Sequence, residues 1–332
     1  MVIAVDAAGG DFYPNNPVLG ALEAISEKPD LQILLVGDES SIRDHLSTAK
    51  ADIDRIGILH ASEVIAMDES PSSAVKNKQQ SSIVLGLGAH KRGECQAFVS
   101  AGNTGALLAA SVFILGKLNG VQRPTIAANF PTMKGPRLLL DAGANLELKP
   151  ETFLQFAKMG TIYAREVLGV TDPSVGLLNV GEEPEKGTEL LKEAFSELSV
   201  LSNFKGNIEG RDIFSAGVDV FLCDGYLGNV ILKMGESIPA ILEFAVGKTM
   251  QEMKLTSVEK QMVIQVLERS LKGFNYEHIG GVPFLGVNGV SMVGHGGSSP
   301  AAIKNMILNA AQCVEMDVNR KIVTSLTTID AV

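Results

Sequence analysis

Tryptophan is absent from the sequence, and tyrosine and cysteine are scarce, with four and three residues in a chain of 332. The cysteines Cys95, Cys223 and Cys313 are scattered and form no C-x-x-C pair. Their odd number and wide spacing exclude a disulfide framework. The histidines show no metal-ligand spacing, and the first residues contain no basic segment followed by a long apolar run. We therefore expect a cytoplasmic protein with reduced thiols and no metal site.

An excess of basic residues is also lacking, because the chain has 28 Lys and Arg against 38 Asp and Glu. The resulting net charge of −10 would not neutralise a phosphate backbone, which excludes a general nucleic-acid binder. An acidic protein partner would have to meet a local basic patch. Hydrophobic residues make up 45% of the chain, which is enough apolar material for a large buried core.

One uncharged stretch, residues 96–116, has about the ~20-residue length of a membrane-spanning helix. Its centre is SAGNTGA, in which Ser100, Gly102, Asn103, Thr104 and Gly105 follow one another closely. Polar and glycine residues are costly at the centre of a bilayer. We therefore expect a strand, a loop and a helix in this stretch.

The same pattern recurs along the chain: a short run rich in Val, Ile and Leu ends abruptly in Gly, Asp, Asn or Ser. Such runs are typical of strands buried on both faces of a parallel sheet. Amphipathic helices are expected between them, for example over 187–201 and 300–322. The alternation predicts a three-layer α/β/α fold with a mostly parallel sheet, as a single domain over 1–332. The runs lie in residues 2–11, 31–38, 97–105, 137–145, 175–183, 220–229 and 291–299.

One segment, 236–275, breaks the alternation with two apolar helical stripes. The stripes are joined by a short turn at Lys254 and Leu255, after which Thr256 and Glu259 have the spacing of a capping box. We expect a helical hairpin inserted in the domain. It would serve either as an oligomer contact or flap on the core, or as a protrusion that touches a membrane or a partner.

Ligands of open parallel sheets bind beyond the carboxyl ends of the strands, where this chain has its small polar clusters. In SAGNTGA, Gly102 and Gly105 allow close backbone approach, while Asn103 and Thr104 can cap the following helix. A helix start with unpaired N–H groups attracts an anion, which favours a phosphate or carboxylate site. A tight turn without any ligand is the alternative.

DAAGGD is a second glycine-rich turn, with Asp6 and Asp11 flanking Gly9 and Gly10, and it lacks the G-x-G-x-x-G spacing of a dinucleotide site. Lys186 and His295 follow two further strand ends, where each could face an anion or be structural. Carboxylates and amides at strand ends could bind Mg²⁺, act as acids and bases, or merely cap helices. These are Asp141, Asn145, Glu182, Glu183 and Asp224.

Taken together, the motifs resemble the acyl-ACP:phosphate acyltransferases of bacterial phospholipid synthesis (the PlsX family), nearly end to end. The resemblance is carried by VDAAGGD, SAGNTGAL, RPTIA, LLLDAGAN, LLNVGEE with a following Lys-Gly, DGYLGNVILK and HGGSS. The chain departs from the family pattern at Ala8, where methionine is usual, and at Leu227, where threonine is common. It also has Val293 and Gly294 where the family often carries a lysine before the histidine.

The resemblance implies transfer of a fatty acyl group from acyl carrier protein to inorganic phosphate, without a cofactor. It also implies an isocitrate/isopropylmalate dehydrogenase-like fold and a homodimer that is weakly attached to the membrane. Lys186 and Asn229 correspond to the catalytic lysine and asparagine of the family. The strand-end turns supply the expected phosphate- and substrate-binding residues, namely Asp6, Gly9, Gly10, Asp11, Ser100, Asn103, Thr104, Gly105, Asp141, Asn145, Asn179, Glu182, Asp224, Gly225 and His295.

A thioester is already activated, and no Ser-His-Asp or Cys-His arrangement is visible, so direct attack by phosphate is expected. Lys76 and Lys78 are candidates for docking the acidic carrier protein. Three other functions stay open on the residues alone. They are a phosphate acyltransferase that uses coenzyme A thioesters, a metal- and nucleotide-dependent decarboxylating dehydrogenase, and a non-catalytic phosphate-binding regulator.

Overall fold

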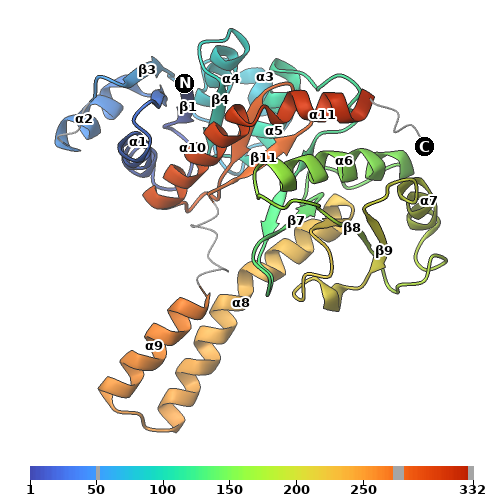
Figure 1. Cartoon of the computed structure of the whole chain (residues 1–332). Coiled ribbons are helices and arrows are strands. Elements are labelled where there is room, and N and C mark those ends of the chain that lie inside the picture. The colour runs from blue at the N-terminus through green and yellow to red at the C-terminus, as the bar shows by residue number, and fades with distance from the viewer. Residues whose placement is uncertain (50–52, 272–279, 328–332) are drawn as a thin grey trace.

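The computed structural model describes residues 1–49, 53–271 and 280–327, which form two sheets with helices packed around them (Figure 1). The first sheet has seven strands in the order β3-β2-β1-β4-β12-β11-β5. Its first five strands are parallel, and β11 is antiparallel to both neighbours. The strands are β1 (Val2–Asp6), β2 (Gln32–Gly37), β3 (Ile56–His60), β4 (Ala97–Ser100), β5 (Thr125–Ile126), β11 (Val282–Leu285) and β12 (Val290–Val293).

The second sheet has five strands in the order β6-β7-β10-β8-β9, and only β6 runs antiparallel to its neighbour. The α/β fold with mostly parallel strands is thus confirmed, although it is built from two sheets. All seven apolar runs that the sequence analysis identified contain a strand. The strands of this sheet are β6 (Ala128–Phe130), β7 (Arg137–Leu140), β8 (Val175–Leu178), β9 (Phe204–Ile208) and β10 (Val220–Leu222).

Helices cover both faces of the first sheet. Helices α1 (Asn15–Glu27) and α10 (Pro300–Glu315) pack on one face, and α4 (Ser82–Lys91) and α5 (Thr104–Ile114) pack on the other. Around the second sheet, α6 contacts β7 and β10, while α8 contacts β6 and β7. The remaining helices are α2 (Glu39–Ala49), α3 (Pro71–Asn77), α6 (Pro150–Glu166), α7 (Glu189–Leu198), α8 (Gly225–Glu252), α9 (Ser257–Leu271) and α11 (Val318–Thr327).

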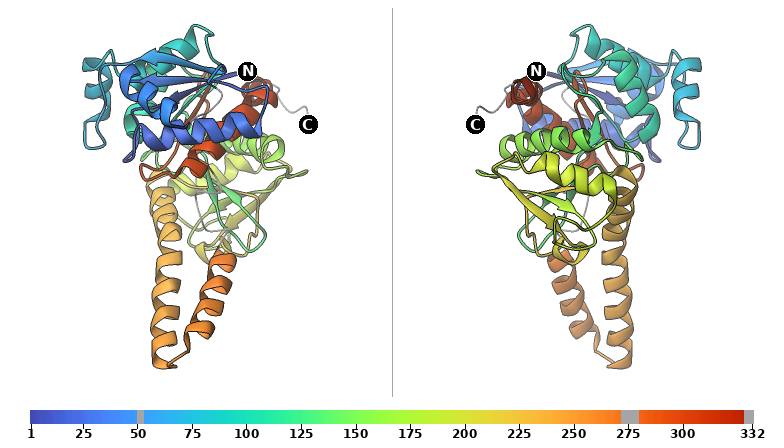
Figure 2. Two further views of the ribbon diagram at one scale, coloured as in Figure 1. Left: turned by 90° about the vertical axis from the view of Figure 1, so that its left-hand side faces the viewer. Right: turned by 90° about the vertical axis from the view of Figure 1, so that its right-hand side faces the viewer.

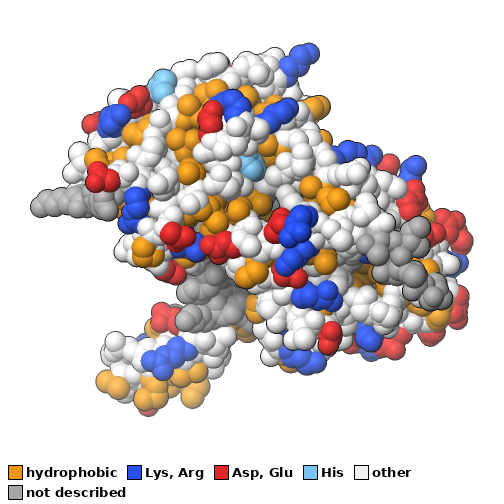
Figure 3. Space-filling view, turned by 45° about the horizontal axis from the view of Figure 1, so that its top comes forward, with side chains coloured by type: hydrophobic (Ala, Val, Ile, Leu, Met, Phe, Trp, Pro, Cys, Tyr) orange, Lys and Arg blue, Asp and Glu red, His pale blue; other side chains and the backbone are white. Residues whose placement is uncertain are grey.

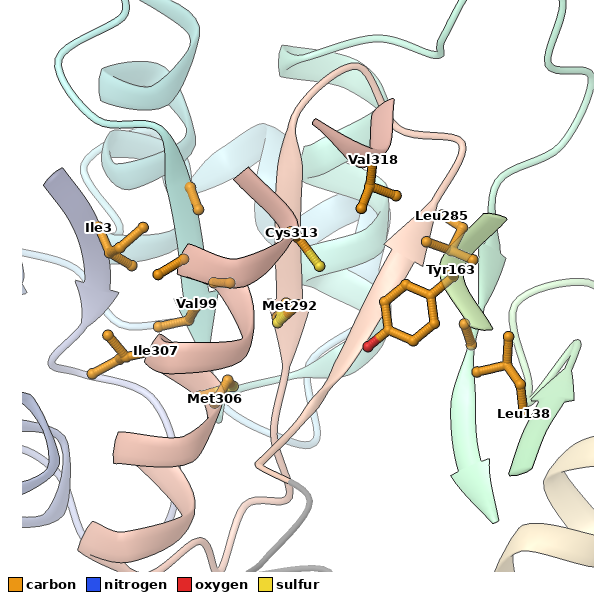
Figure 4. Close-up of a cluster of buried hydrophobic side chains, with 14 of the residues drawn as sticks. Ile3, Val99, Leu138, Tyr163, Leu285, Met292, Met306, Ile307, Cys313 and Val318 are labelled. Carbon is orange, nitrogen blue, oxygen red and sulfur yellow. The ribbon is translucent and has the colours of Figure 1, made fainter. Parts of the chain in front are cut away.

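One hydrophobic cluster joins the two sheets, as Figure 4 shows. Met306 and Ile307 on α10 face Val99 of the first sheet, and Tyr163 on α6 lies between Leu285 of that sheet and Leu138 of the second. All of these side chains are at most 3% exposed. The shared core holds the carboxyl ends of strands from both sheets in one region. The division of the chain into domains stays a prediction.

The uncharged stretch 96–116 forms β4, a loop and α5, as expected. Asn103 caps α5, because its Oδ1 accepts a hydrogen bond from the Ala106 N–H at 3.0 Å. Within the described parts of the chain, no helix combines the length and the apolar composition needed to cross a membrane.

The expectation of one helix over 300–322 is wrong. Asp317, with φ of 50°, separates α10 from α11. A left-handed backbone at a residue other than glycine cannot continue a right-handed helix, so the chain turns there. The apolar spacing continues across the break, which is why the sequence pattern suggested a single helix.

The predicted hairpin is present as α8 and α9, which project away from the body (Figures 1 and 2). The Thr256 N–H donates to Glu259 Oε2 at 2.8 Å and Thr256 Oγ1 accepts from the Glu259 N–H at 3.4 Å, which confirms the capping box. The first helix begins at Gly225 rather than near 236, and it continues through Pro239. Residues 272–275 of the expected insertion lie outside the described residues.

Candidate functional site

The turns after β1 and β4 are built around the buried carboxylate of Asp6. It accepts hydrogen bonds from Ser100 Oγ at 2.6 Å and from the Ala8 N–H at 3.0 Å. The Gly102 N–H in turn donates to Ser100 Oγ at 3.0 Å. A Cβ at Gly9 would lie 2.6 Å from Asp6 Oδ2 and 2.9 Å from the Gly102 nitrogen, so only glycine fits there. The Asp6 carboxylate therefore links the turns after β1 and β4 through hydrogen bonds.

The loop after β12 is tied to the same place. The Asp11 N–H donates to the Gly296 carbonyl at 2.8 Å, and Gly10 has a φ of +90°, which favours glycine. His295 is exposed, and its Nδ1 accepts from the Gly297 N–H at 3.2 Å. The turns that follow β1, β4 and β12 therefore form one connected group at the carboxyl edge of the first sheet.

Asp141 organises the turn after β7 in a similar way, and it is fully buried. Its Oδ1 accepts from the Ile126 and Ala144 N–H groups at 3.1 Å, and its Oδ2 accepts from the Asn145 N–H at 2.6 Å. The amide of Asn145 donates to Asp141 Oδ2 at 2.9 Å and to the Pro124 carbonyl at 2.8 Å. One carboxylate thereby fixes the loop that follows β7 against β5.

Burial raises the pKa of both central carboxyls, Asp6 and Asp141, above the ordinary value. Hydrogen bonds oppose this effect, from Ser100 and Ser82 at Asp6 and from Ala144 and Asn145 at Asp141. Both side chains are thus held by donors within the protein, which is the geometry of a structural brace.

The turn after β10 packs against the Asp141 loop and opens α8. Asp224 caps this helix by accepting from the Leu227 N–H at 2.8 Å, and the Gly225 N–H donates to the Asn145 carbonyl at 2.7 Å. A Cβ at Gly228 would lie 1.8 Å from the Asp141 carbonyl oxygen, so the helix can approach this closely only with glycine. The contact brings the side chain of Asn229, one residue later, to the edge of the Asp141 loop.

Members of both groups of turns line a single cavity of about 530 Å³. The turns that follow strands of the first sheet contribute Asp11, Thr104, His295 and Ser298. The turns that follow strands of the second sheet contribute Gly143 and Asn229. A Cβ at Gly143 would lie 3.5 Å from the Asn229 Cβ, which places these two residues side by side. Of the expected site residues, Asp6, Ser100, Asn103, Asp141 and Asn145 support the cavity from behind, because their side chains bond to the turns themselves.

Thr104 and Ser298 bring two helix starts to this cavity, because α5 begins at Thr104 and α10 begins two residues after Ser298. The start of a helix presents backbone N–H groups and a partial positive charge. The cavity therefore combines anion-attracting helix ends with an exposed amide, Asn229. No group of three or more metal-ligating side chains occurs among residues 1–49, 53–271 and 280–327.

Lys186 lies outside this cavity, in an exposed turn after β8. The Asn179 amide donates to the Lys186 carbonyl at 3.1 Å, and the Lys186 N–H donates to the Glu183 carbonyl at 3.1 Å. Since β8 is the neighbour of β10, the turn with Asn179, Glu182 and Lys186 follows at the same edge of the second sheet. It stands on the opposite side of β10 from the Asp141 loop.

The two lysines expected to dock a partner differ in their surroundings. Lys76 is exposed on α3. The half-buried Lys78 is engaged by its own chain, because its ammonium pairs with Glu69 Oε1 at 2.5 Å and donates to the Val64 carbonyl at 2.7 Å. Lys76 is therefore the better placed of the two for an external contact.

Sequence reasoning missed Asn129, Lys233, Glu236 and Ser298 among the polar residues that line the cavity. Lys233 and Glu236 follow Asn229 by four and seven positions, which places all three on one face of a helix. The signal was in the sequence, but it depends on knowing that α8 starts at Gly225. Ser298 immediately precedes Ser299, whose hydroxyl caps α10.

The sequence matches the model of the family described as "Fatty acid synthesis protein" over residues 1–321. It is 47% identical to a phosphate acyltransferase of Salinibacter ruber over 93% of the chain and 92% of that protein. It is 45% identical to a phosphate acyltransferase of Chlorobaculum parvum, over 98% and 99% of the two chains. Its fold is similar to that of a phosphotransacetylase from Streptococcus pyogenes, with a TM-score of 0.63, 16% identity, and 95% and 94% of the chains covered.

Proposed function

The chain belongs to the fatty acid synthesis protein family, together with the phosphate acyltransferases just described, and on that premise we propose its substrates. It is an acyltransferase that uses phosphate as acceptor. We infer that the acyl donor is a fatty acyl-acyl carrier protein, and that the product, acyl phosphate, is consumed in phospholipid synthesis. The enzyme would act in the cytoplasm and at the membrane surface.

The observation that carries this proposal is the cavity between the two groups of turns. Its polar side offers the starts of α5 and α10, which suit an oxyanion. Its other lining residues are mostly apolar, which suits the acyl part of a thioester better than it suits a charged metabolite. The number of polar groups is small, as expected of a site that orients a reaction between two already reactive molecules.

In the proposed mechanism a phosphate oxygen attacks the carbonyl carbon of the thioester. The new bond is C–O, the bond that breaks is C–S, and the carrier thiolate leaves and takes up a proton. Asn229 would donate a hydrogen bond to the carbonyl oxygen as negative charge develops there. No covalent enzyme intermediate is required, because a thioester is already an activated acyl group.

A direct assay distinguishes this function from its alternatives. Purified protein should form acyl phosphate, trapped as the hydroxamate, from palmitoyl-acyl carrier protein and phosphate. Formation from palmitoyl-coenzyme A but not from the carrier-protein thioester would identify the other donor. Phosphate binding without turnover of either thioester would point to a regulator, and a parallel reaction with a chelator shows whether metal is needed.

Lys186 is proposed to offset the charge of phosphate as it enters. Replacing Lys186 by alanine should raise the KM for phosphate by about 10- to 100-fold, as expected for loss of a charge-assisted contact. The measurement is the initial rate as a function of phosphate concentration, with the nearby Lys192→Ala enzyme as control. An unchanged phosphate dependence would remove Lys186 from this role.

Lys76 is proposed to contact the acidic carrier protein. Lys76→Glu should raise the KM for acyl-acyl carrier protein several-fold and leave that for phosphate unchanged, because only docking is affected. The effect should shrink at high salt, since surface charges are screened. The exposed Lys205→Glu serves as the charge-matched control, and an equal response of both variants would refute a specific contact.

The hairpin is proposed to join two copies of the chain. Its helices carry a row of exposed apolar side chains, which Figure 3 shows on the projecting segment, and a groove of about 450 Å³ between α8 and α9 is lined almost wholly by apolar groups. Exposed apolar surface of this kind marks an association site. Within residues 236–271, the most exposed are Ile241, Phe244, Met253, Val258 and Met262.

Introducing a charge into this row should weaken the dimer. Phe244, which is 75% exposed, is expected to become buried in the dimer, so Phe244→Glu should shift the protein toward monomer at micromolar concentration. Sedimentation velocity measures the change, and Glu243→Ala is the neighbouring control. A weak membrane contact at the hairpin turn is tested with anionic vesicles, and charge reversal at the exposed turn residue Lys254, which lies outside the apolar row, should reduce co-sedimentation without altering the oligomeric state.

A further inference from the structure

We propose that Phe130 and Gly235 set the acyl-chain length that this enzyme accepts, because together they close the apolar end of the cavity. This inference rests on the proposed acyl transfer. It assigns the acyl chain to one wall of the cavity and names two residues that limit its length.

Two walls of the cavity carry mainly apolar side chains away from Asn229. On α8 the cavity is lined by Asn229, then Leu232, then Gly235, which spans about 9 Å at 1.5 Å per residue. Along β5 and β6 it is lined by Ile126, Ala128 and Phe130, with the buried Asn129 as the one polar residue among them. Residues two apart in an extended chain point to the same side, so Ile126, Ala128 and Phe130 form one apolar surface about 13 Å long.

The two walls run in the same direction. At one end, the Ile126 N–H is bonded to Asp141, whose loop also contains Gly143, the neighbour of Asn229. At the other end, Phe130 lies against Gly235. Leu232 packs against both the cluster that includes Ile126 and the cluster that includes Phe130, as expected of a residue midway between them. The apolar corridor therefore starts beside Asn229, where the carbonyl would react.

The far end is closed by a tight contact. A Cβ at Gly235 would lie 2.6 Å and 3.0 Å from two ring carbons of Phe130, so the ring rests directly on the helix backbone. The Phe130 side chain is only 1% exposed, and its ring also packs on that of Phe214, with centroids 5.4 Å apart. The ring is thus held from two sides, and it cannot withdraw without repacking.

The chemistry of the wall favours an aliphatic chain as its occupant. Val282 and Val293 add to the apolar lining, while Lys233 and Glu236, which also line the cavity, neutralise each other in an ion pair at 2.8 Å. Phosphate is charged and would not be stabilised by contact with such a surface. A volume of about 530 Å³ lies within the range of roughly 300–1,000 Å³ that is typical of sites for small organic ligands.

The test compares acyl-carrier-protein thioesters of increasing length, from butyryl through octanoyl and dodecanoyl to palmitoyl, in the acyl-phosphate assay. Phe130→Ala should open the closed end and raise kcat/KM for the longest chain relative to octanoyl about 10-fold. Gly235→Ala should push the ring into the corridor and lower that ratio by a similar factor, as is usual when a pocket loses room for a methylene group. The butyryl thioester, which does not reach Phe130, reports on the reacting groups.

Matched variants separate this effect from general disturbance. Gly247 lies on the same helix, and a Cβ there would meet nothing within 4 Å, so Gly247→Ala should leave the length profile unchanged. Adding Phe130→Leu to Gly235→Ala should restore the profile, because the smaller side chain relieves the clash. If Gly235→Ala does not fold, the chain-length profile of Phe130→Ala alone tests the inference.

The inference is overturned if the variants keep butyryl turnover and show the same length profile as the unmodified enzyme. Absence of acyl phosphate from every thioester with the unmodified enzyme would instead contradict the proposed function. The two failures therefore have different signatures.

Discussion

Asn229→Ala is expected to lower kcat by about 10²–10³-fold while the protein stays folded. Losing one preorganised donor to a developing oxyanion typically has an effect of this size. The Asn229 side chain is exposed beside Gly143 and makes no side-chain hydrogen bond within the described parts of the chain, so its removal leaves no buried group without a partner. The rate should be measured with both substrates saturating.

The neighbouring residue provides a control for this experiment. Val230 is 49% exposed, follows Asn229 on the same helix and does not line the cavity. Val230→Ala should therefore keep near-normal turnover. If Asn229→Ala also retained most of its turnover, the carbonyl oxygen would have to be stabilised by another group, and the backbone N–H groups at the start of α5 would be the next to consider.

Asp141→Ala is expected to lower the free energy of unfolding by about 3–4 kcal/mol. The substitution leaves the N–H groups of Ile126, Ala144 and Asn145 without their acceptor, and a buried donor without a partner costs about 1–3 kcal/mol. Some water will enter from the cavity and reduce the total. Urea denaturation measures the change, and activity should fall as well, because the same loop contains Gly143 beside Asn229.

Glu147→Ala is the matched control, since Glu147 is an exposed carboxylate six positions later in the chain. It should change the free energy of unfolding by less than about 0.5 kcal/mol. An equally small loss for Asp141→Ala would mean that the loop does not depend on this carboxylate, and that the sequence of the turn alone determines its shape.

The sequence predicted the central strands of the sheets but not the edge strands. Central strands such as β1 and β4 are buried on both faces, so they appear as continuous apolar runs. The edge strands β3 and β9 are partly exposed, and β9 contains Lys205 and Gly206, so they have no comparable signature. The short strands β5 and β6 were missed because two or three residues carry no readable period.

The candidate site was predictable in its turns but not in its walls. Glycines at positions 9 and 228 are required by close contacts, and their motifs stood out in the sequence. The apolar wall formed by Ala128, Phe130 and Leu232 looks like ordinary core, and only the fold reveals that it lines a cavity. For Lys186 the situation is reversed. The resemblance to the family implies a catalytic role, but the geometry of this chain does not explain that role.

Pro239 divides α8 into a part that packs against the body of the protein and a projecting part, the arm. Before it, the helix is pressed onto Asp141 through Gly228 and onto Phe130 through Gly235. After it, the helix forms a groove with α9 and projects from the body (Figure 2). Proline has no N–H to bond to the carbonyl four residues earlier, which weakens the rod at that point.

The arm from Pro239 to Glu252 is about 20 Å long, so a bend of ten degrees at the proline would displace its tip by roughly 3 Å. The tip of the hairpin can thus move together with the surface that it contacts, while Asn229, which precedes the proline, keeps its position at the cavity.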